Sequence, residues 1–533
     1  MKSRKLMCVA ATTFALMAIS LQLAAQEYHA RHHHYKLIDM GTFGGPQSYL
    51  NGFEYSTFSS VQNLNKIGTL AGWADSPKLD PYRLSGNSYG NFCFNYDGSP
   101  CHVSRAFQWQ DGVRSELPAL HSGLSSATAW ISSNGLIAGT SQNGETDPLD
   151  PGFPEDRAVL WRNSNIIDRG TLPEGGYESG AQAVNSRGQV VGWALNTVPD
   201  AYSMGLWSVL YNFYAPVYPY QTRAFLWQDG AMQDLGTLAP EPTLMPWPSN
   251  EQGQAIGISY TNSTPNQVTT RCSSPGSTIP TQDPFLWENG KMIDIGTLGG
   301  TCGFPSWINS HGQVVGYSDL VEDQVNHPFL WTNAKGMQDL GTLGGSYGTA
   351  SMINDFGEVV GGSSLEGDSQ FDAFLWDGKM RDLGALDGCA YAFSINERSQ
   401  VVGNWGGAQC ALGAFLWEDG GPMVDLSTLV SPIPELSPLL VININDRGEI
   451  AGIGNDASGN GHAIFLIPCD ENHHGVDGCD YSLVDATTAA QVRAPQAAQS
   501  SAAENGNYPR TLREPSGARL VQRRGYSGPL PHN

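Results

Sequence analysis

A nine-residue pattern of apolar and polar positions recurs along the chain and predicts pairs of short β-strands joined by a tight turn. Its clearest copy, residues 353–361, reads I-N-D-F-G-E-V-V-G. Asparagine can bond its own backbone in such a turn, and glycine supplies the positive φ that a bulged turn needs. Close copies and looser ones bring the total to eight: residues 308–316, 184–192, 395–403 and 444–452, then 131–139, 249–257 and 64–72.

A second pattern follows each copy and predicts a second hairpin. Residues 225–227 read F-L-W, and after an Asp-Gly turn the strand at residues 232–238 reads M-Q-D-L-G-T-L. Asp-Gly and Asn-Gly are the strongest short-range hairpin signals. Four short strands in a repeat of roughly 45 residues are typical of a β-propeller blade. Other copies of F-L-W or its variants are residues 285–287, 329–331, 374–376, 415–417, 107–109, 159–161 and 465–467.

The order of these pieces predicts how the ring closes. The repeats begin with a fourth strand, residues 37–43, and end with a third strand, residues 465–467. An N-terminal strand that completes the last blade would leave no open sheet edge. We therefore expect an all-β, eight-bladed β-propeller of four-stranded blades, with residues 35–40 paired beside residues 462–467. Seven blades is the alternative, because the copies at 64–72 and 249–257 are the most divergent.

A triplet before the Leu-Trp of several repeats carries a family resemblance. It reads R-A-F at residues 223–225, H-P-F at 327–329, D-A-F at 372–374 and G-A-F at 413–415. With the D-L-G-T-L-G-G and I-N-x-x-G-x-V-V-G segments, these triplets resemble the extracellular HAF repeat proteins, named after a His-Ala-Phe triplet. The resemblance covers residues 35–467 and implies a propeller-like repeat fold and export. It transfers no catalytic or binding residues.

The chain ends differ from the repeats. Residues 1–25 read as a secretory signal, with basic residues, an apolar stretch too short to span a membrane, and a small-residue cleavage site. Residues 26–34 are expected to form a flexible His-rich arm, for which metal binding is the weaker interpretation. Residues 468–533 are expected to be a disordered tail, because beyond about residue 480 few large apolar residues remain. No second apolar run is long enough to span a membrane, so the mature protein should be secreted, extracellular or periplasmic.

Charge and cysteine content narrow the class of protein further. The formal net charge is −23, which argues against nucleic-acid binding. Cys8 would leave with the signal, and an even number of cysteines in an oxidising compartment predicts disulfides. Positions in the repeat favour four local pairs: Cys93–Cys101, Cys272–Cys302, Cys389–Cys410 and Cys469–Cys479.

The loops between second and third strands carry the best functional clue. They hold 34, 19, 32 and 27 residues in the first four repeats, but only 11 or 12 in the last four. Long loops on a rigid scaffold are usually functional or disordered. Aromatic residues in the blade connections are expected on the same face, where they could stack on sugars or pack on a protein partner. Local packing beneath the long loops is an equally weighted alternative. They are Tyr177, Trp247, Phe304, Tyr347 and Tyr391.

These features favour a monomeric, exported binding or interaction module, with a glycan or protein ligand on the long-loop face over blades one to four. One alternative is a propeller-type glycoside hydrolase or lyase, for which Glu174, Glu178 and His121 are the unrepeated candidates. A structural cell-envelope protein is another. Acids that recur in every fourth strand, such as Asp234, should instead bond nearby backbone N–H groups. No cofactor or catalytic residue is predicted, and calcium is only a minor alternative.

Overall fold

The computed structural model describes residues 31–52, 61–82, 100–121, 123–148, 154–173, 175–200, 220–238, 244–266, 280–407, 410–418, 420–430, 436–479, 481 and 484–486. These residues lie in one compact unit, within Met1–Arg493; a second unit, Ala494–Asn533, lies outside the described residues. The described part is all-β apart from two short 3₁₀ turns, η1 (Glu366–Asp368) and η2 (Leu426–Leu429).

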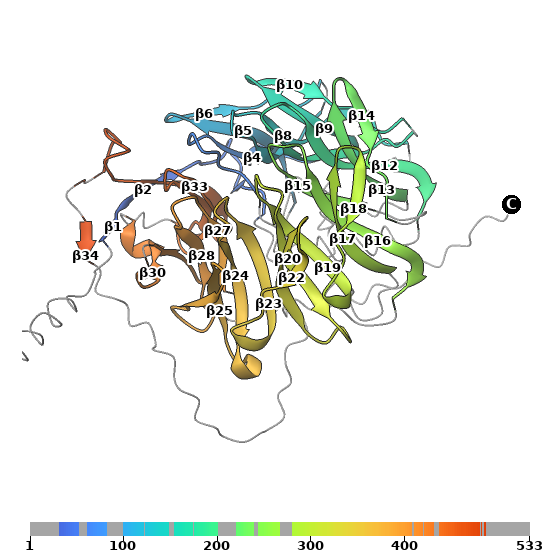
Figure 1. Ribbon diagram of the computed structural model, residues 1–533. Helices are drawn as coiled ribbons and strands as arrows, with labels where there is room; N and C mark the ends of the chain where they lie inside the picture. Colours follow the sequence, from blue (N-terminus) through green and yellow to red (C-terminus); the bar gives the residue numbers. More distant parts are fainter. Residues whose placement is uncertain are drawn as a thin grey trace, which may run out of the picture. The chain divides into compact units, whose positions relative to one another are not determined.

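Four-stranded antiparallel groups make up the described fold, and we number them 1 to 8 (Figure 1). Groups 1, 2, 3, 7 and 8 are separate sheets, whereas groups 4, 5 and 6 are joined into one twelve-stranded sheet. Two parallel contacts make that junction: Gln282 pairs with Cys302, and Asn326 pairs with Tyr347. All-β topology built from four-stranded antiparallel sheets is that of a β-propeller.

The strands of groups 1 to 4 are as follows: β3 (Ser48–Tyr49), β4 (Leu70–Leu79), β5 (His102–Gln110) and β6 (Val113–Glu116); β7 (Ser126–Ile131), β8 (Ile137–Thr146), β9 (Pro154–Arg162) and β10 (Asn165–Asp168); β11 (Ser179–Val184), β12 (Val190–Pro199), β13 (Tyr220–Gln228) and β14 (Ala231–Asp234); β15 (Leu244–Ser249), β16 (Ala255–Pro265), β17 (Pro280–Glu288) and β18 (Lys291–Asp294).

The strands of groups 5 to 8 are as follows: β19 (Gly299–Ile308), β20 (Val314–Leu320), β21 (Asn326–Thr332) and β22 (Gly336–Asp339); β23 (Gly344–Ile353), β24 (Val359–Leu365), β25 (Phe371–Trp376) and β26 (Met380–Gly384); β27 (Ala390–Ile395), β28 (Val401–Trp405), β29 (Gly413–Trp417) and β30 (Val424–Asp425); β31 (Leu439–Ile444), β32 (Ile450–Asn455), β33 (Gly461–Pro468) and β2 (Tyr35–Asp39). Outside these groups, β1 (Arg31–His33) pairs with β34 (Val484–Ala486).

Group 8 combines the two ends of the chain. β2 pairs antiparallel with β33, with Tyr35 opposite Pro468 and Asp39 opposite Ile464. The predicted pairing of residues 35–40 beside 462–467 is therefore confirmed. Successive groups contact one another along the chain, and β3 of group 1 contacts β33 of group 8. Group 8 thus receives its fourth strand from the N-terminal end and also packs on group 1.

The asparagine of each N-x-x-G turn binds its own turn, and most also bind the next group. Asn354 shows the pattern: its Oδ1 accepts from the Glu358 backbone N–H, and its Nδ2 donates to the Glu358 carboxylate and to the carbonyl of Asn396. Both ends of the amide are therefore used within the fold. The same donation from turn to neighbouring turn joins Asn65 to Ser132, Asn250 to Asn309, Asn309 to Asn354, Asn396 to Asn445 and Asn445 to Asn65.

The glycine at the end of the nine-residue pattern lies opposite a bulge. In group 5 the first strand slips register between Pro305 and Trp307, which brings the Phe304 carbonyl against Gly316. A Cβ at Gly316 would clash with that carbonyl. A bulge places two residues opposite one and bends the strand. The glycine therefore recurs because a side chain there would collide with the bulged first strand.

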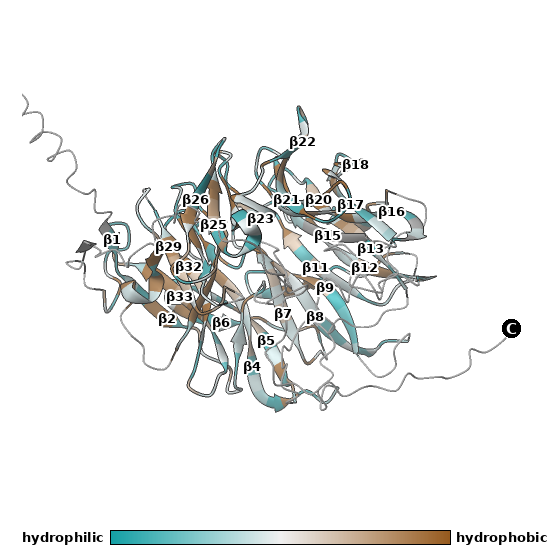
Figure 2. Cartoon of the chain, turned by 90° about the horizontal axis from the view of Figure 1, so that it is seen from below, coloured by the Kyte–Doolittle hydropathy of each residue, from teal (hydrophilic) through white to brown (hydrophobic). Residues whose placement is uncertain are grey.

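The apolar core follows the F-L-W strands. The phenylalanine of this motif is fully buried in six groups: Phe107, Phe225, Phe285, Phe329, Phe374 and Phe415. Group 8 differs, because Gly452 pairs with Ile464, as Gly192 pairs with Phe225. Aligning Phe465 with the motif phenylalanine is therefore wrong by one residue. In Figure 2, β29, β32 and β33 are mostly hydrophobic, whereas β9 and β16 carry more polar positions.

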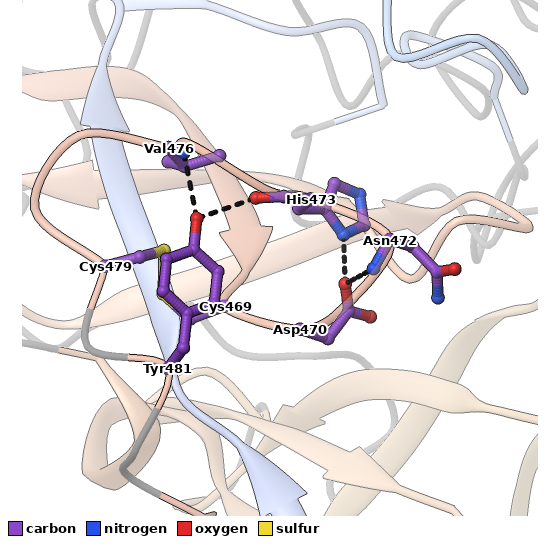
Figure 3. The surroundings of a disulfide bond; sticks show 7 residues. All are labelled: Cys469, Asp470, Asn472, His473, Val476, Cys479 and Tyr481. Atoms are coloured by element: carbon purple, nitrogen blue, oxygen red, sulfur yellow. Dashed lines mark hydrogen bonds and ion pairs between the residues drawn. A yellow bond between two sulfur atoms is a disulfide. The ribbon is translucent and has the colours of Figure 1, made fainter.

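Parts of both chain ends are ordered, contrary to expectation. Arg31–His33 forms β1, and the fully buried His32 bonds Glu418 through its Nδ1, at 2.7 Å. The described residues after β33 also fold back, and Tyr481 donates to the carbonyl of His473 (Figure 3). The flexible arm and disordered tail are corrected for these residues. Composition missed the order because a few polar contacts and one disulfide, not a new apolar core, hold these segments.

Two of the expected cysteine pairs lie at disulfide distance. The Cα atoms are 5.1 Å apart in Cys389–Cys410 and 5.4 Å apart in Cys469–Cys479, within the usual range. Cys469–Cys479 closes the loop that carries His473 (Figure 3). Two other cysteines, Cys101 and Cys302, are disulfide-bonded, and their expected partners Cys93 and Cys272 lie outside the described residues.

Candidate functional site

The first four groups carry longer second and third strands than the last four. β4, β8 and β12 have 10 residues and β16 has 11, whereas β20 and β24 have 7, β28 has 5 and β32 has 6. Pairing resumes beyond an irregularity: in group 1, Asp75 pairs with Ser104 and then Leu79 pairs with His102. Part of each long loop is therefore an ordered ribbon. We call β4–β5, β8–β9, β12–β13 and β16–β17 the extended hairpins.

A short motif recurs at the irregularity of all four extended hairpins. It reads S-P-K-L-D at residues 76–80, N-G-E-T-D at 143–147, N-T-V-P-D at 196–200 and N-S-T-P-N at 262–266. The first side chain accepts a hydrogen bond from the backbone N–H two residues later, as Asn143 does from Glu145 at 2.8 Å. Such Asx and Ser turns are local and sequence-coded. The equivalent bonds are Lys78 to Ser76, Val198 to Asn196 and Thr264 to Asn262.

The last residue of the motif bonds within its own loop in group 1 and reaches the next group in group 4. Asp80, Asp147 and Asp200 are all buried. Asp80 accepts from the Tyr82 backbone N–H at 3.0 Å, and in group 4 Asn266 donates to Thr301 at 2.7 Å. Buried carboxylates are rare unless they are bonded. This repeated polar residue was missed from the sequence, although it stands eight residues after the preceding glycine in groups 1 to 3 and nine residues after it in group 4.

The extended hairpins lie on the same face as the connections between groups. In the shorter loops Asp323 accepts from the Thr301 backbone and Asp368 from the Ser346 backbone, both at 2.6 Å. These bonds join the loop between second and third strands to the beginning of the first strand of the same group, where the connection enters it. Both kinds of segment therefore share one face, which we call the hairpin face. The N-x-x-G turns lie at the opposite ends of the same strands, on what we call the turn face.

Buried carboxyl groups gather where the hairpin of group 2 meets group 3. The Asp156 backbone N–H donates to Oε2 of Glu178 at 2.8 Å, just before β11 begins. Burial, and then the neighbouring Asp156 and Asp147 carboxylates, raise the pKa of Glu178 well above its usual value. Arg157 bonds Glu155 at 2.5 Å and also the Tyr177 carbonyl. Burial and like charge together favour the protonated form of Glu178.

These carboxyl groups pack the hairpin on group 3 and do not face open solvent. Glu178 is 2% exposed and Asp156 is 5% exposed. A catalytic carboxylate must touch its substrate, so this pair does not form an open acid–base site of the kind a glycosidase needs. Of the other catalytic candidates, His121 is exposed and Glu174 lies outside the described residues. Glu178 therefore has a structural explanation.

Group 1 contains a related buried acid. Asp75 accepts hydrogen bonds from Ser104 Oγ at 2.9 Å and from the Tyr49 hydroxyl at 3.3 Å. Burial raises the pKa of Asp75 to about 7, against the lowering effect of these bonds. Tyr49 stacks on Trp73, with ring centroids 5.6 Å apart. Bonded acids therefore lie beneath the hairpin face in at least two neighbouring groups.

The connection aromatics separate into buried and partly exposed residues. Phe304 is 6% exposed and stacks on Tyr317, and Tyr391 is 4% exposed and stacks on Phe371. Because a buried ring offers no face to a ligand, the assignment of these two as ligand-stacking residues is corrected to local packing. Tyr177 and Tyr347 are half-buried, and the side chain of Trp247 lies outside the described residues.

The recurrent acid of the fourth strand is structural, as expected. Asp339 accepts from the Gly341 backbone N–H at 2.7 Å and also bonds His327, the first residue of its triplet, at 2.9 Å. The same backbone bond forms at Asp39, Asp168, Asp234, Asp294, Asp382 and Asp425. Group 4 has an acid at the triplet position instead: burial and then Asp294 raise the pKa of Asp283 to about 7.

The described residues lack two features that would point to metal or membrane function. Within them, no three His, Cys, Asp or Glu side chains gather so that they could hold a metal ion. No helix in that part of the chain has the length and apolar character to cross a membrane.

Comparison with known proteins gives no family. No family model matches the chain, and no curated protein matches it. The β-propeller domain of the Trilobed protease from Pyrococcus furiosus is 11% identical, with a TM-score of 0.37 over 72% of this chain and 100% of that chain. Oligogalacturonate lyase in complex with manganese is 11% identical, with a TM-score of 0.35 over 82% of this chain and 98% of that one. At this level the similarities carry no argument about activity, and the fold rests on the strand pairing.

Proposed function

We propose that the eight groups are the blades of one closed propeller, related to the extracellular HAF repeat proteins, and that the exported protein is a binding module. Its ligand, a glycan or a protein, binds the hairpin face over groups 1 to 4. The observation that carries this proposal is the motif repeated in the four extended hairpins. Four loops of different length keep the same polar turn and the same terminal Asp or Asn.

The scaffold itself does not require these hairpins. Groups 5 to 8 make the same connection with second strands of 5 to 7 residues. Surface loops tolerate insertion at small entropic cost, so length alone could reflect drift. Drift does not explain a hydrogen-bonded ribbon in which the same Asx or Ser turn and the same terminal Asp or Asn recur four times. An ordered extension on one half of one face suits a ligand site.

Binding explains the hairpin face better than catalysis does. The carboxyl groups of Glu178 and Asp156 are covered, whereas Tyr177, at the edge of the same cluster, is partly exposed. Tyrosine offers a rigid apolar face and a hydroxyl, which suits stacking on a sugar or packing on a protein side chain. A glycoside hydrolase or lyase, and a structural envelope role, remain the alternatives that the assay distinguishes.

A glycan array with the mature protein, followed by hairpin shortening, tests the proposal. The variant replaces residues 193–224 of group 3 by the group 6 loop, residues 362–373. The control replaces the equally short group 5 loop, residues 317–328, by the same group 6 sequence. We expect the first variant to fold but lose binding, and the control to keep it. Full affinity in a folded group 3 variant would refute the hairpin-face proposal, and turnover of a glycan would favour the enzyme.

A further inference from the structure

Group 8 lacks the hairpin turn that joins third and fourth strands in other groups. Its third and fourth strands are β33 and β2, so Pro468 and Tyr35 lie opposite each other where the chain enters and leaves. The flanking segments diverge there: β1 reaches Glu418 of group 7, and the segment after Pro468 folds over group 8. A pocket of about 220 Å³ lies between these segments and the turns of groups 7 and 8. We call it the end pocket; it opens on the turn face.

Two carboxylates and a tyrosine form the buried part of the end pocket. Glu418, Asp470 and Tyr35 line it, and all three are buried. Glu418 accepts from His32 at 2.7 Å and from Gln400 at 2.5 Å; these bonds outweigh burial and lower its pKa. The bond from His473 likewise lowers the pKa of Asp470 against the effect of burial. Glu418 and Asp470 are therefore both ionised near neutral pH and give the floor of the pocket its negative charge.

The tyrosine hydroxyl shares this environment. Burial, followed by the charges of Glu418 and Asp470, raises the pKa of Tyr35, and Arg398 opposes them. The phenol therefore stays protonated and can donate or accept a hydrogen bond. Both carboxylates and the guanidinium line the same pocket as this hydroxyl.

The mouth of the end pocket is polar and more exposed. Arg398, Glu471 and Asn472 line it and are exposed to solvent. Arg398 makes no ion pair with the residues that the structure describes. It lies against Gly448, where a Cβ would come within 2.6 Å of its Nη2 atom. His33 also lines the pocket, and its Nδ1 is buried without a partner among the described atoms.

We propose that the end pocket binds the primary ammonium group of a small organic molecule, such as an amino acid, a polyamine or an amino sugar. An ammonium group has three donors and no acceptor, which matches two carboxylates and a phenol oxygen. A simple anion would meet the negative floor. A bare metal ion would need at least a third acidic or imidazole ligand, and no such group of three forms within the described residues. Arg398 at the mouth favours ligands that also carry a carboxylate.

Calorimetric titration of the mature protein tests the proposal, with L-lysine, 1,4-diaminobutane and glucosamine as probes and N-acetylglucosamine as the matched neutral control. Titration to about 10 mM detects even millimolar binding. We expect glucosamine or another amine to bind at least about tenfold more tightly than the acetylated sugar, because acetylation removes the charge that the carboxylates pair with. The strongest of the three amines identifies the ligand class. Failure of every amine to bind, or equal binding of the acetylated sugar, would overturn the proposal.

Two substitutions locate the binding. Glu418→Gln should weaken amine binding by about tenfold or more, because it removes one charge of a charge-assisted bond. Tyr35→Phe keeps both carboxylates and should weaken binding several-fold, so it serves if the first variant does not fold. Glu322→Gln, exposed on the hairpin face, is the control with unchanged affinity. Unchanged affinity in folded Glu418→Gln and Tyr35→Phe proteins would contradict the assignment, and the shortened group 3 hairpin should leave this binding intact.

Discussion

Substituting one turn asparagine should show how much the bonds between neighbouring groups stabilise the fold. Asn445, only 6% exposed, makes three bonds within its turn: it accepts from the backbones of Arg447 and Glu449 and donates to the Glu449 carboxylate. Its fourth bond, to the Asn65 carbonyl at 2.9 Å, joins group 8 to group 1. Asn445→Ala removes all four.

Asn185 provides a matched comparison. It makes the same three bonds within its turn, to Arg187 and Gln189. Among the described residues it makes no bond to the neighbouring group. Each buried group left without a partner costs about 1–3 kcal/mol, so Asn445→Ala should lower the free energy of unfolding by about 3–5 kcal/mol. Asn185→Ala should lower the free energy of unfolding by less than Asn445→Ala does. The difference between the two is the contribution of the one bond between groups, about 1–3 kcal/mol.

Urea unfolding followed by tryptophan fluorescence measures the difference, because the chain has 14 tryptophans. Both variants should keep the native far-ultraviolet circular dichroism before unfolding. If the two substitutions lower the free energy of unfolding by the same amount, within about 0.5 kcal/mol, the bond to Asn65 does not stabilise the closure.

Three further predictions concern the chain ends and an acid pair. Deleting residues 35–40 exposes the edge of β33 and should lower the thermal midpoint strongly by circular dichroism; an unchanged midpoint would contradict closure by β2. Asp283→His places an imidazole beside Asp294, as in groups that have His at this position. At pH 8 this substitution should raise the urea midpoint and increase the free energy of unfolding by about 1 kcal/mol. A lower midpoint would mean that the two acids do not repel each other. The pair of His473 and Asp470 should stabilise the fold most in mild acid. The pKa of His473 is raised above 6.5, so the stability that this group contributes is lost as the pH rises through the raised pKa. The pKa of Asp470 is lowered below 3.8, so its contribution is lost as the pH falls through the lowered pKa. The thermal midpoint of wild type minus His473→Gln, measured from about pH 4 to 9, should therefore peak near pH 5; a flat difference would refute the pairing.

Local sequence patterns predicted the repeated strands and turns well. The bonds that Asn354 makes within its own turn follow from residues close in sequence. Its donation to Asn396 depends on the spacing between neighbouring groups, which no local pattern contains. The predicted register of group 8 was wrong because residues 463–467 are all apolar. Alternation of apolar and polar residues therefore cannot distinguish Ile464 from Phe465 as the partner of Gly452.

The candidate site was harder to predict because exposure depends on neighbouring segments. Tyr347 and Tyr391 occupy similar places in the sequence pattern, yet Tyr391 is covered by Phe371 and bonds Thr349 at 2.7 Å. Loop length pointed to the first four groups, but not to the fact that the strands extend into these loops. The end pocket combines both chain ends with turns of groups 7 and 8, so no single stretch of sequence contains its signal.

The pairing of β2 with β33 also sets the order in which the protein can fold. Asp39 and His462, which bond each other across these strands, are 423 positions apart. During synthesis β2 emerges long before its partner β33 exists. It therefore remains an unpaired strand until nearly the whole chain has been made. Contacts this distant in sequence slow folding and prolong the time in which exposed strands can aggregate. A truncated or stalled chain would contain β2 but not β33. Because β2 would stay unpaired in such a chain, incomplete copies are good targets for proteolysis.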